Sequence, residues 1–161
     1  MGYIQYLTRF PVQSLPVNLL RARKLRQAEF EFFIRDVKSV TTALQTITPK
    51  HVDFKQVTLH VRSNHIQRDP RHENPNEVLR EVDCRQWMDL DNTLIQLQEL
   101  HPICVKVTWF EGDQDGVVKH EQIMHLLEHI LPKLTKKGVV KLEGIYLRHH
   151  DRSRALVCNY G

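Results

Sequence analysis

The sequence has few cysteines, no glycine-rich phosphate loop and no long apolar run, and each shortage excludes a class of protein. Only 3 of the 161 residues are cysteine. That number is small and odd, which argues against a disulfide framework and favours an intracellular setting, in the cytoplasm or the nucleus. The chain contains no P-loop and no GxGxxG segment after a strand, so no nucleotide-binding fingerprint is present. No apolar run could span a bilayer and no secretory segment is present, so we expect no membrane partner.

What is present is the composition of an ordinary globular chain. Hydrophobic residues make up 41% and charged residues 26% of the sequence, which are typical values for a soluble domain with its own core. We therefore expect one α/β domain over residues 1–161. An irregular N-terminal segment is expected at 1–25 and a polar loop at 63–82.

The positive charge is modest and permits several partners. The net charge of +4 allows nucleic-acid binding without requiring it. An RNA- or phosphate-binding surface built from Arg21–Arg26 and Arg148–Arg154 is therefore kept as an alternative. Neither run is surrounded by the aromatic or glycine-rich residues that usually accompany such a surface, so we expect no nucleic-acid partner.

The clearest organisation lies between Leu90 and Leu147, where helical and strand periods alternate. A helix is predicted from the spacing of Leu90, Leu94, Leu97 and Leu100, and it should end at His101-Pro102. Alternating apolar residues then predict strands at Ile103–Phe110 and Val139–Leu147, paired in parallel. Between them, an amphipathic helix that Pro132 should kink or divide is predicted from Ile123, Leu126, Leu127, Ile130, Leu131 and Leu134.

Two further elements are predicted in the N-terminal half, and a short one at each end. A long amphipathic helix is predicted from Phe30, Phe33, Ile34, Val37, Thr41, Leu44 and Ile47. A strand at Phe54–Val61 should follow it, and Trp87 should return the chain to the core. Short extended pieces are expected at Tyr3–Leu7 and at Ala155–Cys158, the latter as an edge strand. Three helix-then-strand units predict an α/β fold: an irregular leucine-rich-repeat-like stack with a small, mostly parallel sheet.

Asp89-Leu90-Asp91-Asn92-Thr93 matches the pattern DxDxT. This resembles the first motif of the haloacid-dehalogenase-like phosphatases. On that resemblance Asp89 would be the nucleophile and Asp91 the acid, with Mg²⁺ between them. That family places the motif at the end of a buried strand, whereas the preceding Arg80–Met88 is rich in charge. A Mg²⁺-dependent phosphohydrolase is thus an alternative, and the preferred interpretation is that Asp89 caps a helix with Asp91 in its first turn.

His125-Leu126-Leu127-Glu128-His129 matches HxxEH, the inverted zinc-protease motif. Two histidines at i and i+4 can share a metal ion, so His125 and His129 are alternative metal ligands. The protease family needs a distant downstream glutamate as a third ligand, and Glu143 is the sole glutamate after His129. Both histidines also lie off the apolar face of the predicted helix. We therefore expect a solvent-facing pair and no metal or other cofactor.

The region from Trp87 to Leu147 resembles the C-terminal part of the large fungal (mushroom-type) F-box families. The residues that carry the resemblance are Trp87, Leu90, Asp91, Leu94, Pro132, Leu134, Gly138, Val139 and Val140. An F-box begins with an L-P-x-E-L-L-like signature, which Leu15–Leu20 matches only in part, and it docks a Skp-type ubiquitin-ligase adaptor. Leu25–Ile47 reads instead as one long helix. The resemblance therefore implies a leucine-rich-like surface for substrate recognition, with no clear F-box to recruit the adaptor.

These patterns favour a non-catalytic module that binds another, unidentified protein. The expected contact surface is the strand side of the stack or the Ser63–Glu81 loop. We expect no catalytic residues. In the alternative, a Mg²⁺-dependent phosphohydrolase, Asp89 and Asp91 would be catalytic.

Overall fold

The computed structural model describes residues 9–11, 19, 24–62, 82–111, 120–147 and 157–158. The described strands are β1 (Arg9–Pro11), β2 (Gln27–Phe33), β3 (Gln56–Arg62), β4 (Cys104–Glu111), β5 (Val140–Leu147) and β6 (Val157–Cys158). The described helices are α1 (Val37–Leu44), α3 (Cys84–Leu100), α4 (His120–Ile130) and α5 (Pro132–Lys136). The protein is thus an α/β structure, as predicted.

The strands form one sheet whose spatial order is the order of the chain. Strands β1 to β5 lie side by side in sequence, each parallel to the next, and β6 pairs antiparallel with β5. The order does not reverse anywhere in the described sheet. It therefore lacks the switch point at which doubly wound α/β folds bind their ligands.

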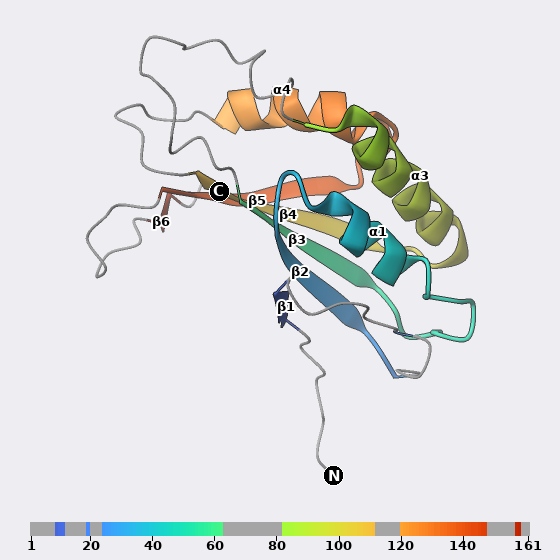
Figure 1. The fold of residues 1–161 in the computed structure, drawn as a ribbon. Coiled ribbons are helices and arrows are strands. Elements are labelled where there is room, and N and C mark those ends of the chain that lie inside the picture. The colour runs from blue at the N-terminus through green and yellow to red at the C-terminus, as the bar shows by residue number, and fades with distance from the viewer. Residues whose placement is uncertain are drawn as a thin grey trace, which may run out of the picture.

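The described helices lie on one side of this sheet. Figure 1 shows α1, α3 and α4 along the same face of β2–β5, with β1 and β6 at the two edges. Sequential parallel strands joined by crossovers of one hand must place their helices on one face. The opposite face is consequently left without a helix in the described part of the chain.

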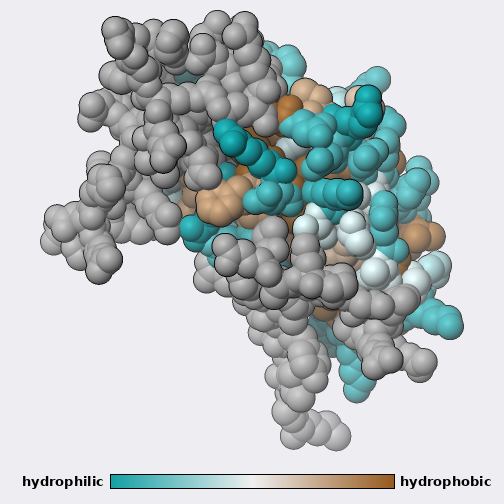
Figure 2. Space-filling view, in the orientation of Figure 1, coloured by the Kyte–Doolittle hydropathy of each residue, from teal (hydrophilic) through white to brown (hydrophobic). Residues whose placement is uncertain are grey.

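The core lies between the sheet and the helices. Three rows of inward side chains cross β2–β5: Ala28, Val57, Val105 and Val140; Phe30, Leu59, Val107 and Leu142; Phe32, Val61, Trp109 and Ile145. Apart from the partly buried Val140 and Leu142, each is at most 5% exposed. The outer surface over α3 and α4 is mostly hydrophilic, as amphipathic helices require (Figure 2).

The predicted long helix over Phe30–Ile47 is wrong. Residues Gln27–Phe33 form strand β2, with alternating burial, and only Val37–Leu44 is helical. Ala28, Phe30 and Phe32 face the helices while Glu29 and Glu31 face the other way. The spacing of Phe30 and Phe33 fits a helix, but the alternation beginning at Ala28 fits a strand. Strand β2 pairs with β3 along its whole length, which satisfies the backbone hydrogen bonds of β2 and favours the strand over the helix.

The strands predicted at Phe54–Val61, Ile103–Phe110 and Val139–Leu147 are confirmed within a residue or two, whereas α3 begins at Cys84, several residues before the helix predicted from Leu90. Helix α3 ends at Leu100 before Pro102, and the next apolar helix is divided at Pro132 into α4 and α5. Gly138 follows α5 with a φ of 69°, the left-handed geometry that suits glycine after a helix. Leu100 departs from its prediction, because it is 51% exposed and not part of the buried face.

Several predicted segments lie outside the described residues. Tyr3–Leu7, Ser63–Glu81 and Arg148–Arg154 are not described, nor are Arg21–Arg23 of the basic run. Within the expected irregular segment at 1–25, the three residues of β1 pair with β2. At the other end, β6 pairs antiparallel with β5 at the edge of the sheet, where an edge strand was expected within Ala155–Cys158.

Candidate functional site

The sheet face opposite the helices carries polar and aromatic side chains from four adjacent strands. Residues alternate between faces along a strand, so the residues between the inward rows project to this side. We name this surface the strand face and define it by Glu29, Glu31, His60, Arg62, Lys106, Phe110, Glu143 and Tyr146. The strand side was one of the two surfaces expected to meet a partner.

Acidic side chains of β2 pair with basic side chains of β3 across the strand face. Arg62 forms an ion pair with Glu31, and Nε2 of His60 lies 3.4 Å from Oε2 of Glu29. These side chains are half-buried, with exposed fractions of 27% for Arg62 and 18% for Glu31. The pairs therefore link β2 to β3 through four side chains of the strand face.

Aromatic rings continue this arrangement onto β4 and β5. The rings of Phe110 and Tyr146 are stacked, with centroids 5.0 Å apart and an interplanar angle of 19°. The guanidinium of Arg62 lies 5.7 Å from the centroid of Phe110, a cation–π distance, and the His60 ring lies 6.1 Å away on the same strand as Arg62. The strand face thus offers an aromatic platform bordered by the Arg62–Glu31 ion pair.

A glycine in β5 makes room for the Tyr146 ring. A Cβ atom at Gly144 would lie 3.3 Å from Cε2 of Tyr146, tighter than ordinary contact. Gly144 pairs with Thr108 just after an irregularity in the β4–β5 register. Between the same two strands of the strand face, Nζ of Lys106 lies 3.1 Å from Oε1 of Glu143. On β5, Glu143 is therefore paired with Lys106 of β4, and the Tyr146 ring lies over Gly144 and against Phe110 of β4.

The DxDxT motif lies within helix α3 and does not form one site. The helix begins at Cys84 and its N-cap is Asp83, whose carboxylate accepts from the backbone amides of Arg85 and Gln86. The prediction that Asp89 caps the helix was therefore wrong. Asp89 is exposed, whereas Asp91 is 0% exposed. Residues two apart on a helix point about 200° apart, which explains the separation.

The Asp91 carboxylate caps a different helix, far along the chain. Its Oδ2 accepts from the amide of Lys133 at 2.9 Å, and its Oδ1 accepts from the amide of Leu134 at 3.1 Å. These amides are in the first turn of α5, where Leu131 holds the N-cap position without a side-chain bond. Asp91 thus joins α3 to α5, and both of its oxygens are engaged.

Replacing Asp91 with alanine is expected to lower the free energy of unfolding by about 2–3 kcal/mol, because one buried and one partly buried amide lose their cap. Urea denaturation followed by circular dichroism measures the change. Asp89→Ala is the matched control, since an exposed helical site should change stability by no more than about 0.5 kcal/mol. An equal loss in both variants would contradict the capping role of Asp91.

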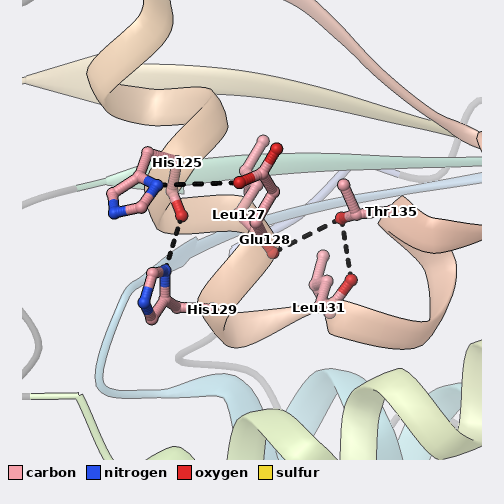
Figure 3. A network of polar contacts seen from close by, with 6 residues as sticks. All are labelled: His125, Leu127, Glu128, His129, Leu131 and Thr135. Carbon is pink, nitrogen blue, oxygen red and sulfur yellow. Dashed lines mark hydrogen bonds and ion pairs between the residues drawn. The ribbon is translucent and has the colours of Figure 1, made fainter.

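The two histidines of the HxxEH motif are exposed on α4, as expected from the sequence. Figure 3 shows His125 and His129 on the same side of the helix, with Glu128 beside His125. The ring centroids are 4.5 Å apart. The described residues contain no group of three or more His, Cys, Asp or Glu side chains that could hold a metal ion. The protease-like interpretation therefore gains no third ligand in this part of the chain.

Sequence reasoning missed the contribution of β2 to the strand face. Glu29 and Glu31 lay inside or beside the helix predicted from Phe30 onward, so their alternation with apolar residues was not used. The signal was present in Gln27–Phe33, where every second residue is apolar. The partnership with His60 and Arg62 could not be predicted, because it depends on the register of β2 against β3.

Comparison with protein-family models, with curated proteins and with solved structures finds no match to this chain. Among the described helices, none combines the length and the apolar character needed to cross a membrane.

Proposed function

We propose that this protein is a non-catalytic protein–protein interaction module that binds its partner through the strand face. The observation that carries the proposal is the platform made by Arg62, Phe110 and Tyr146. Tyrosine and arginine are enriched among the residues that dominate binding energy at protein interfaces. Side chains already held by neighbours also lose less conformational entropy when a partner binds.

The strand order supports a leucine-rich-repeat-like stack as the architecture behind this surface. Parallel strands β2 to β5 follow one another in sequence, each connected to the next through a helix, and build a sheet with helices on one side. Repeat proteins of this kind bind partners on the surface that their aligned strands create. Here the units differ in length, so the proposed stack is an irregular one.

Because Trp87–Leu147 resembles part of the fungal F-box families, we propose that the partner is a substrate of a ubiquitin ligase. An F-box is a short helical segment, whereas residues 27–33 of this chain form a strand. We therefore propose substrate recognition as the role of this chain and do not assign adaptor docking to residues 24–62. An intracellular setting is part of the proposal, and the exposed thiols of Cys84 and Cys104 are free.

The strand face is tested by comparing partner capture by matched variants. The tagged chain is used to capture a stoichiometric partner from its own cells, and the affinity for that purified partner is then measured. Tyr146→Ala is expected to weaken binding by about 2 kcal/mol, or about 30-fold in Kd, because it removes half of the aromatic stack. Met88→Ala is the control, because Met88 is a large side chain, 55% exposed, on α3.

Each outcome bears on the proposal. Loss of affinity in Tyr146→Ala with unchanged binding by Met88→Ala supports the strand face. Unchanged binding by both Tyr146→Ala and Phe110→Ala, with folding verified by circular dichroism, contradicts it. Capture of a Skp-type adaptor in place of a substrate would contradict the assignment of substrate recognition alone.

A further inference from the structure

The exposed side of α4 carries two neighbouring histidines, His125 and His129, which lie outside the strand face. His125 and His129 are one helical turn apart, so their side chains lie one above the other on the exposed side of α4 (Figure 3). Their ring centroids are 4.5 Å apart and the ring planes meet at 72°. The His125 side chain is 71% exposed, and both rings can adjust without disturbing the core.

The surroundings of Nδ1 bear on which nitrogen of each ring carries the lone pair, by a hydrogen bond in His129 and by a nearby charge in His125. Nδ1 of His129 lies 2.8 Å from the backbone oxygen of His125, and a carbonyl oxygen can only accept. In the neutral ring of His129, Nδ1 therefore carries the proton and Nε2 carries the lone pair. Nδ1 of His125 lies 3.6 Å from Oε2 of Glu128, beyond hydrogen-bond distance, so the negative carboxylate favours a proton on this nitrogen through its charge alone.

This arrangement is the one that metal-binding histidines use. A histidine ligand donates its other ring N–H to a carboxylate or a backbone carbonyl, which fixes the tautomer and strengthens the metal bond. Figure 3 shows both Nε2 atoms on the side of the rings away from those acceptors. Among the described residues, neither Nε2 atom has a hydrogen-bond partner.

We propose that His125 and His129 form a two-histidine site for a divalent transition metal ion such as Ni²⁺, Cu²⁺ or Zn²⁺. Metal–imidazole bonds are about 2.0–2.1 Å long for Zn²⁺, and the two exposed rings can rotate to bring both Nε2 atoms to one ion. Water fills the other coordination positions, because no group of three ligands exists among the described residues. Imidazole favours these ions over Mg²⁺ and Ca²⁺, which prefer oxygen.

The proposal is independent of the proposed function. The pair lies on α4, on the helix side of the sheet, and shares no residue with the strand face (Figure 1). Glu128 is assigned a positioning role through His125 and does not need to touch the ion.

Isothermal titration of the full chain with Ni²⁺ tests the site. The wild-type chain is compared with His125→Ala, His129→Ala and Glu128→Gln, and with His120→Ala as a control from the same helix. Both histidine variants are expected to lose one Ni²⁺-binding event, whereas His120→Ala keeps it. Glu128→Gln is expected to bind Ni²⁺ about 10-fold more weakly, the usual effect of removing an orienting partner.

The comparison between variants separates this site from other metal-binding groups, such as the free thiols of Cys84 and Cys104. Wild-type affinity and stoichiometry in both His125→Ala and His129→Ala would overturn the proposal. Equal binding of Mg²⁺ and Ni²⁺ to the histidine-dependent site would also overturn it. Because both histidines are exposed, circular dichroism should show the same fold in all variants.

Discussion

Replacing Trp87 with alanine is expected to lower the free energy of unfolding by about 3–5 kcal/mol, the range for removing a large buried aromatic side chain. Trp87 is 0% exposed in the first turns of α3. Its ring lies 6.0 Å from that of Phe32, and its indole N–H donates to the backbone oxygen of Ile34 at 2.9 Å. Ile34 follows directly after β2, so one side chain joins the start of α3 to the end of β2.

Two variants separate the packing contribution from that of the hydrogen bond. Trp87→Phe keeps most of the apolar volume and leaves the Ile34 oxygen without its donor, so a smaller loss of about 1–3 kcal/mol is expected. Met88→Ala changes the next residue, which is 55% exposed, and should alter stability by about 0.5 kcal/mol or less. Urea denaturation measures all three. A loss in Trp87→Ala no larger than in Met88→Ala would mean that Trp87 does not hold α3 to the sheet.

Leu127→Ala is expected to lower the free energy of unfolding by about 2–5 kcal/mol, through lost burial and the cavity left behind. Leu127 is 0% exposed on the buried face of α4, between Ile123 and Ile130. Its backbone oxygen also accepts from the amide of Leu131 at 2.8 Å and from the hydroxyl of Thr135 at 3.4 Å (Figure 3). The substitution leaves these backbone contacts in place, so the loss reports side-chain packing.

Leu100→Ala provides the matched control for Leu127. Both substitutions remove the same atoms from a helix, but Leu100 is 51% exposed at the end of α3. Its replacement should change stability by about 0.5 kcal/mol or less. Thermal or urea denaturation monitored by circular dichroism at matched concentration gives both values. Similar losses for the two leucines would mean that α4 packs on a different face from the one described.

Local patterns predicted most of the described elements because their information is contained within each segment. The apolar spacing of α4, the alternation of β4 and the proline between α4 and α5 each specify a local geometry that the structure adopts. The same reasoning failed at β2, because Phe30 and Phe33 satisfy a helical spacing while Phe30 and Phe32 satisfy a strand spacing. A short apolar segment with both patterns is decided by its neighbours.

The functional features depended more strongly on the tertiary structure. The sequence presented Asp91 as part of a DxDxT motif, and the fold uses its carboxylate to cap α5. The sequence also presented His125 and His129 as an incomplete protease motif. In the structure, a backbone oxygen and the Glu128 carboxylate lie beside the two Nδ1 atoms. In both cases the residue type suggested a chemistry, while the partners of its polar atoms determined what it can do.

The sequence by itself determined the α/β class, the parallel pairing of β4 and β5, the division at Pro132 and the solvent-facing position of the histidine pair. Each follows from periodicity or from the backbone chemistry of one residue. Only the tertiary structure decided that Gln27–Phe33 is a strand and that Glu31 meets Arg62. It also placed Arg62, Phe110 and Tyr146, from three different strands, together on the strand face. The physical reason is that such contacts depend on strand register, which distant segments fix jointly when they bury their apolar faces in one core.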